Sequence, residues 1–222
     1  FGQGYDMGTD PIENFSWGPE FDGVVRPWTP VVVDPNTGVS SQLIRPYSAV
    51  KNQLQNALNM GVTYRNGLQI EGGDEKYGYY FSYINTDNKG IFDNSYYKRH
   101  ALTGNMSVKL SDKLSSRVNV QYSKINQRAI LGAGTANFGG TFQALLQQAA
   151  NIPVNELRDY NSLYNGFAGY YGGYTANPYY LMNNVNNDNK VDNLLASAEI
   201  TYKPIEPLTL TARIGDNMTI SN

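Results

Sequence analysis

Apolar and polar residues alternate through the stretch ALTGNMSVKLSDKLSSRVNVQYS, residues 101–123. On both sides of a polar break at 111–114, the larger apolar residues fall on even-numbered positions: Leu102, Met106, Val108, Leu110, Val118, Val120 and Tyr122. Successive side chains of a strand point to opposite faces, so the pattern predicts two strands with one apolar and one polar face, joined by a tight turn at 111–114. A soluble sandwich buries such an apolar face under a second sheet, whereas an outer-membrane barrel turns it toward lipid.

The same alternation predicts two further hairpins. One pairs residues 62–70 with 77–83, and the other pairs 191–203 with 208–218. The connections fall into a short and a long class: short turns at 72–76, 111–114 and 204–207, and long stretches at 1–58, 85–100 and 125–190. Short turns at one edge and long loops at the other are typical of outer-membrane barrels. We therefore expect an all-β fold, an antiparallel transmembrane β-barrel segment of about six strands, with a secreted sandwich as the alternative.

The long connections are rich in Gly, Pro, Asp and Asn, and two short helices are expected within them. Residues 48–60 place apolar side chains at helical spacing, with Ser48 as a candidate N-cap and Gly61 as the residue that ends the helix. Residues 141–153, TFQALLQQAANIP, predict the second helix. The expected organisation is an extracellular loop with a short helix at 1–58, two hairpins at 61–126, a long extracellular loop at 127–190 and a third hairpin at 191–220.

Composition excludes several kinds of function. The formal net charge is -2 and the 17 Lys and Arg residues are scattered, so no nucleic-acid partner is expected. The absence of Cys and the single histidine, His100, exclude a disulfide scaffold, a thiolate metal site and a histidine-based catalytic triad within the chain. Paired carboxylates for glycoside hydrolysis remain, but no spacing singles out a pair, and we expect no enzyme.

Membrane and ligand motifs give further expectations. No apolar run approaches the roughly 18 residues of a membrane helix, and a mean hydropathy of -0.46 suits both a soluble domain and a barrel. The first residues lack a signal peptide, so we expect that it was removed or that the chain is an excerpt. Asp87-Asn88 and the NNDNK run at 186–190 lack EF-hand spacing and are interpreted as turns. Residues 132–140, GAGTANFGG, do not form a phosphate loop, and no cofactor or metal is expected.

Five segments together resemble a known family. They are SWGPEFDG (16–23), residues 67–115, IPVNELRDY (152–160), NPYYLMNNVNNDNKVDN (177–193) and ASAEITYKPIEPLTLTARIG (196–215). Their order and spacing are similar to the early barrel region of the SusC/RagA-type TonB-dependent transporters. Each segment alone is a weak signal, but five in register span nearly the whole chain.

The resemblance implies a barrel of about 22 antiparallel strands that a separate N-terminal plug domain closes. It further implies a multi-pass protein of the outer membrane of a Gram-negative bacterium, in contact with outer-membrane lipid. Such transporters import oligosaccharides or peptides with a SusD-like lipoprotein lid, and a TonB-ExbB-ExbD complex acts through the plug. This chain contains no TonB box and no plug. Six strands cannot close a barrel, so we expect a piece of a larger one.

Tyrosine, with 18 residues, is unusually frequent and falls into two groups. The strand group has the parity of the apolar face and suits the aromatic girdle at a membrane interface: Tyr64, Tyr77, Tyr79, Tyr83, Tyr122 and Tyr202. The loop group, with two tryptophans, comprises the candidate residues for substrate or lid contact: Trp17, Trp28, Tyr164, Tyr170, Tyr171, Tyr174, Tyr179 and Tyr180. Aromatic rings stack on sugars, but the same residues can pack a loop on itself or against a lid protein. In the alternative of a secreted all-β carbohydrate-binding or adhesin domain, the tyrosines would bind carbohydrate.

The polar side chains of the predicted strands form the opposite face. They are Thr63, Arg65, Gln69, Glu71, Arg117, Asn119, Gln121, Glu199, Thr201 and Arg213. A wet barrel lumen suits such groups, and several are expected to contact a plug. The sequence singles out none of them as a substrate ligand.

Overall fold

The computed structural model of the chain describes residues 16–130, 140–167, 176–185 and 187–222. The chain divides into two compact units. The sheet unit comprises Gly61–Lys89, Tyr96–Arg128 and Asp188–Asn222, and the loop unit comprises Phe1–Met60, Gly90–Ser95 and Ala129–Asn187. Each unit is therefore assembled from three separate stretches of sequence.

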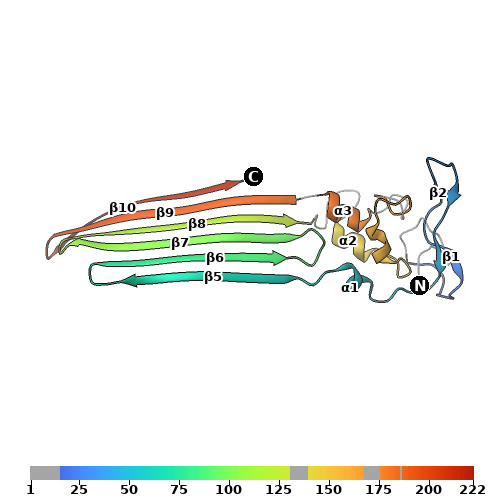
Figure 1. Cartoon of the computed structure of the whole chain (residues 1–222), viewed down its shortest axis with the longest axis horizontal. Coiled ribbons are helices and arrows are strands. Elements are labelled where there is room, and N and C mark those ends of the chain that lie inside the picture. The colour runs from blue at the N-terminus through green and yellow to red at the C-terminus, as the bar shows by residue number, and fades with distance from the viewer. Residues whose placement is uncertain (1–15, 131–139, 168–175, 186) are drawn as a thin grey trace. The chain divides into compact units, whose positions relative to one another are not determined.

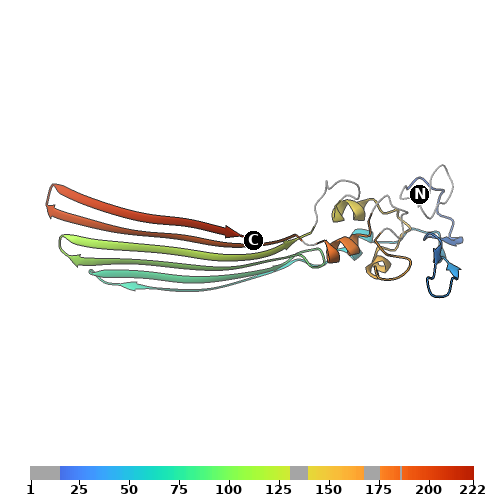
Figure 2. The ribbon, with the colours of Figure 1, turned by 90° about the horizontal axis from the view of Figure 1, so that it is seen from above.

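The sheet unit is one antiparallel sheet of six strands in the order β10-β9-β8-β7-β6-β5. The strands are β5 (Val62–Gly73), β6 (Tyr77–Lys89), β7 (Tyr96–Ser111), β8 (Leu114–Ala129), β9 (Asn187–Ile205) and β10 (Leu208–Ser221). They lie side by side in chain order as a single layer (Figures 1 and 2). The expected three hairpins and the all-β fold class, a segment of an antiparallel barrel, are confirmed.

The tight turns form for local reasons. In the β5–β6 turn, the carboxylate of Asp74 accepts hydrogen bonds from the backbone N–H groups of Lys76 (2.7 Å) and Tyr77 (3.1 Å), which is the usual turn chemistry of Asp. Gly73 precedes this turn with φ 157°, and a Cβ there would clash with the carbonyl of Tyr77. These contacts fix the register of the first hairpin.

The connection between β6 and β7 corrects a prediction. We expected a long connection at 85–100, but the two strands stay paired from Asn85↔His100 to Lys89↔Tyr96, and the connection is only Gly90–Ser95. Both faces of the sheet are polar at this level, so the alternation that marks a strand disappears from the sequence although the ladder continues.

One face of the sheet carries the apolar residues and is exposed; we call it the apolar face. Leu102 is 39% exposed, Val120 38% and Ile200 51%. In the described part of the sheet unit, no second sheet packs on these side chains. This arrangement differs from a sandwich, which buries the equivalent face.

The apolar residues form a band that occupies only part of each strand. It runs through Leu102–Leu110 on β7, Leu114–Tyr122 on β8 and Leu194–Tyr202 on β9, about nine residues in each case, which is close to the length a membrane-spanning strand requires. At one edge of the band, the hydroxyl of Tyr83 bonds Nδ1 of His100 (2.8 Å) and that of Tyr122 bonds Asp192 (2.5 Å). These rings thus lie between an apolar and a polar zone, as the girdle interpretation requires.

The loop unit has short strands, short helices and its own core. Its strands are β1 (Val25–Pro27) paired with β4 (Ile44–Pro46), and β2 (Val32–Val33) paired with β3 (Ser40–Ser41). Its helices are α1 (Gln53–Ala57), α2 (Thr141–Leu146), the 3-10 helix η1 (Val154–Arg158) and α3 (Pro178–Asn184). The core residues are Trp28, Ala57, Leu145, Ala149, Ile152, Val154, Leu157, Tyr179 and Met182.

The helix predictions are correct in part. The helix α1 forms, but its N-cap is Asn52 in the left-handed region, with φ 56°, rather than Ser48, and it ends at Ala57 because Leu58 is extended. A predicted helix at 141–153 is shortened to α2, which ends at Leu146. None of the helices in the described part of the chain is long and apolar enough to span a bilayer.

The helix α3 was not predicted, although its start carries a clear signal. The side chain of Asn177 accepts a hydrogen bond from the backbone N–H of Tyr179 (2.9 Å), and Pro178 occupies the first helical position. Asn at the N-cap followed by Pro is a favourable helix start.

Candidate functional site

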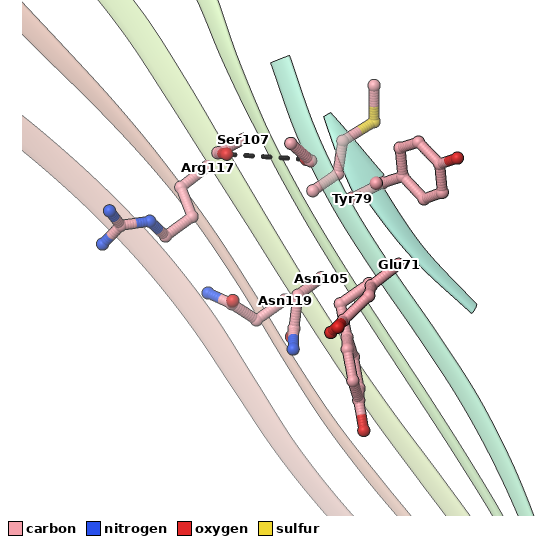
Figure 3. Close-up of a pocket in the computed structure, with 10 residues that line it drawn as sticks. Glu71, Tyr79, Asn105, Ser107, Arg117 and Asn119 are labelled. Carbon is pink, nitrogen blue, oxygen red and sulfur yellow. Dashed lines mark hydrogen bonds between the residues drawn. The ribbon is translucent and has the colours of Figure 1, made fainter. Parts of the chain in front are cut away.

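The polar face of the sheet carries the candidate site. Four side chains form one row across four strands because they are direct partners in the ladder: Glu71, Tyr80, Asn105 and Asn119. The next row, toward the tight turns, comprises Gly73, Gly78, Ser107 and Arg117. All of these residues except Gly73 line a hollow of about 530 Å³, which Gly72, Tyr79 and Met106 from the parity of the apolar face also border. Figure 3 labels Glu71, Tyr79, Asn105, Ser107, Arg117 and Asn119 at this hollow.

Glycine shapes the floor of this hollow. A Cβ on Gly78 would lie 3.1 Å from Oγ of Ser107, and this hydroxyl donates a hydrogen bond to the carbonyl of Gly78 at 3.5 Å (Figure 3). Since neither Gly73 nor Gly78 has a side chain, the row beside Glu71 and Tyr80 is open. The missing side chains leave space at this row for a ligand group or for another protein surface.

The rim of the hollow mixes hydrogen-bond donors and acceptors. The amide of Asn119 donates to Oγ of Ser197 at 3.3 Å, and Arg117 forms no ion pair among the described residues. A second hollow of about 340 Å³ lies on the same face, and Arg117, Lys109, Glu199 and Thr201 are among its lining residues. Amide, hydroxyl and guanidinium groups together suit a polar ligand that is rich in oxygen atoms.

Several residues expected on the polar face meet here. Glu71, Arg117 and Asn119 line the first hollow, and the neighbouring Glu199 is hydrogen-bonded and ion-paired to Arg213. Tyr80, Asn105 and Ser107 also line the first hollow, although they were not among the residues predicted to line the lumen. Strand parity and the hairpin register could have found them, because each is a direct partner of a residue already singled out. Among the described residues, no acidic, His or Cys cluster could hold a metal ion.

Two of the candidate loop aromatics are core residues. Trp28 is 2% exposed and Tyr179 is 1% exposed. The Arg158 guanidinium lies 4.7 Å from the centre of the Tyr179 ring, and Arg158 also pairs with Asp93 at 3.1 Å. Burial raises the pKa of the Tyr179 phenol. Both rings therefore pack inside the loop unit, and neither has an accessible face for a substrate or a lid.

The other candidates are more accessible. Trp17 is 71% exposed, and the half-buried Tyr164 shares a hydrogen bond of 2.8 Å with Ser41. Tyr180 contacts the rings of Tyr160 and Phe167 edge-on. Three of the candidates lie outside the described residues: Tyr170, Tyr171 and Tyr174. The aromatic group thus divides into buried and accessible members.

Charge also organises the start of the loop unit. The Arg26 guanidinium bonds both carboxylate oxygens of Asp22 at 2.6 Å, and this lowers the pKa of Asp22 to about 2. Arg26 also lies 4.9 Å from the centre of the Tyr47 ring. The segment before β1 is held by these contacts.

No model of a known protein family matches the chain. A curated protein named as a TonB-dependent receptor, from Formosa agariphila, is 29% identical over 144 residues. The match covers 64% of this chain and 13% of that receptor, so the chain spans a small part of the length of its relative. The similarity supports a relationship at the level of TonB-dependent receptors.

Proposed function

We propose that this chain is part of the wall of a TonB-dependent outer-membrane transporter. The observation that carries the proposal is the long single-layer sheet with an exposed apolar band on one face and polar hollows on the other. An apolar band of about nine residues per strand can face hydrocarbon, and the polar face then lines a hydrated lumen. The similarity to a TonB-dependent receptor points to the same class.

In this function the sheet contributes a surface along which a polar solute moves. The hollow beside Glu71, Tyr80 and Asn119 offers carboxylate, hydroxyl and amide groups to a solute or to a plug domain. The chain would not transport anything alone, because an open sheet leaves backbone groups unpaired at its edges and these are costly in lipid. A plug domain and the TonB-ExbB-ExbD complex would supply gating and energy.

The finer assignment is to the SusC/RagA type, which imports oligosaccharides or peptides together with a SusD-like lipoprotein lid. Support comes from the five sequence segments and from the accessible aromatic rings of the loop unit, Trp17, Tyr164 and Tyr180. Aromatic rings suit both sugar stacking and contact with a lid. We propose no catalytic activity for the chain.

The test uses the full-length protein in its native host. We expect it to fractionate with the outer membrane and to support uptake of at least one oligosaccharide or peptide, and we expect uptake to stop when the tonB gene is deleted. The matched measurement is growth on a panel of oligosaccharides and peptides with and without the transporter. Recovery of the full-length protein in the medium, or uptake that is indifferent to TonB, would contradict the proposal.

A further inference from the structure

A pair of arginines on the polar face lies apart from the hollows described above. Arg65 on β5 and Arg99 on β7 are both direct ladder partners of Thr86 on β6. The three side chains share one face, and the two arginines are separated by two strand spacings, about 10 Å. Guanidinium groups on long side chains can converge over such a distance on one ligand group, with the Thr86 hydroxyl between them.

Neither arginine is neutralised within the described part of the chain. Arg65 and Arg99 are both exposed and form no ion pair there. The acids on the polar face of the six strands are Glu71 and Glu199. Glu71 lies six positions along β5 from Arg65, about 20 Å away, and Glu199 is bound by Arg213. Positive charge therefore remains available at the Arg65–Thr86–Arg99 row.

The row lies beyond the apolar band. At this level the opposite face carries Asn85, Asp87, Lys98 and His100 in place of apolar residues. Asp87 pairs with Lys98 at 3.6 Å on that face and is directed away from the arginines. The row therefore lies beyond the apolar band, at the end of the sheet opposite the tight turns. In the proposed transporter this end faces outward, so a dissolved ligand would reach the row before the hollows.

We propose that Arg65, Thr86 and Arg99 form a binding site for the acidic groups of an anionic oligosaccharide. The inference rests on the proposed function, because it places a substrate at the mouth of the lumen. Arginine binds carboxylate and sulfate through paired N–H donors, and hydrogen bonds to charged groups are the strong ones. Along the polar face, Asn105, Asn119 and Gln121 offer amides that hydrogen-bond sugar hydroxyls. Because amides also hydrogen-bond a peptide backbone, an acidic peptide is tested beside the glycan.

The experiment measures binding to the purified full-length transporter in detergent by calorimetry. The probes are a uronate hexamer, a sulfated galactan hexamer, a neutral galactose hexamer and hexaglutamate. We expect an acidic hexamer to bind more tightly than the neutral one, with an affinity that falls at high salt. The double variant Arg65→Gln/Arg99→Gln should weaken this binding about tenfold or more and leave neutral binding unchanged.

The matched control is Lys124→Gln. Lys124 is an exposed cation on the apolar face and forms no ion pair among the described residues, so the same loss of charge on the other side of the sheet should not change binding. Resistance of the folded barrel to unfolding in sodium dodecyl sulfate at room temperature checks that every variant folds.

Three results would overturn the inference. They are equal binding of acidic and neutral hexamers, hexaglutamate as the preferred ligand, and unchanged acidic binding in a double variant whose barrel is less stable. The last would assign the arginines to a protein partner inside the barrel. If TonB-dependent uptake of neutral sugars persists in any of these cases, the transporter proposal stands and only the acidic site fails.

Discussion

At the scale of single residues, the loop aromatics show what residue type alone cannot decide. Tyr179 and Trp28 share their chemistry with the exposed Trp17, and the sequence placed all three in one candidate set. Burial separates them, because Tyr179 packs with residues such as Ile152 and Leu157 that come from a different part of the loop. Such long-range packing leaves no periodic signal in a segment without regular structure.

Tyr179 provides the test at this scale. Tyr179→Ala should destabilise the loop unit by about 3–5 kcal/mol, because a buried aromatic ring is removed and Arg158 loses the ring it covers. Tyr179→Phe keeps the ring and should cost less than about 1 kcal/mol. Hydrogen exchange of residues 140–167 in the full-length protein measures both. A loss as large in the Phe variant would show that the hydroxyl, rather than the ring, stabilises the loop.

At the scale of elements, the two-residue alternation of apolar and polar side chains and the residues of the tight turns predicted most of the sheet. All three hairpins follow from alternation with the correct faces, since Val120 and Gln121 point to opposite sides as expected. The alternation did not predict the strand ends, because β6 and β7 stay paired beyond Asn85 and His100, where neither face is apolar. Strand parity assigned the polar side chains to the correct face of the sheet. Only the pairing register in the structure showed which of them are neighbours across strands.

A pair of neighbouring substitutions on β8 tests the assignment of the faces. Val120→Arg places a charge in the apolar band and should destabilise the full-length barrel in lipid by about 2–4 kcal/mol. Gln121→Arg places the same charge on the polar face and should have little effect. Urea unfolding in phosphatidylcholine vesicles, followed by tryptophan fluorescence, measures both. Equal destabilisation by the two substitutions would mean that the exposed apolar face does not meet lipid.

At the scale of the whole molecule, the sheet has two unpaired edges. In the described chain β5 and β10 each pair on one side only, and the side chains of β10 are exposed along its whole length. Edges of this length attract further strands or aggregate. The sheet unit therefore requires additional strands beside β5 and β10 to be stable in a membrane.

The 222-residue chain expressed alone tests this requirement and separates the transporter from the alternative of a secreted carbohydrate-binding or adhesin domain. We expect it to be insoluble without detergent and to lack the heat-modifiable migration of a closed barrel, because its edges stay open. Size-exclusion chromatography with and without detergent is the measurement. A monodisperse, detergent-free monomer would favour the secreted domain.

The short connection Gly90–Ser95 has a consequence for how such a protein could acquire new ligands. Asp93 binds both Asn59 and Arg158, and Asn94 binds Asn183, so this connection links three distant parts of the loop unit. Grafting a single loop from a relative would leave its former neighbours without partners. We therefore expect that relatives with a different ligand specificity differ at the same time in the stretches around Asn59, Arg158 and Asn183.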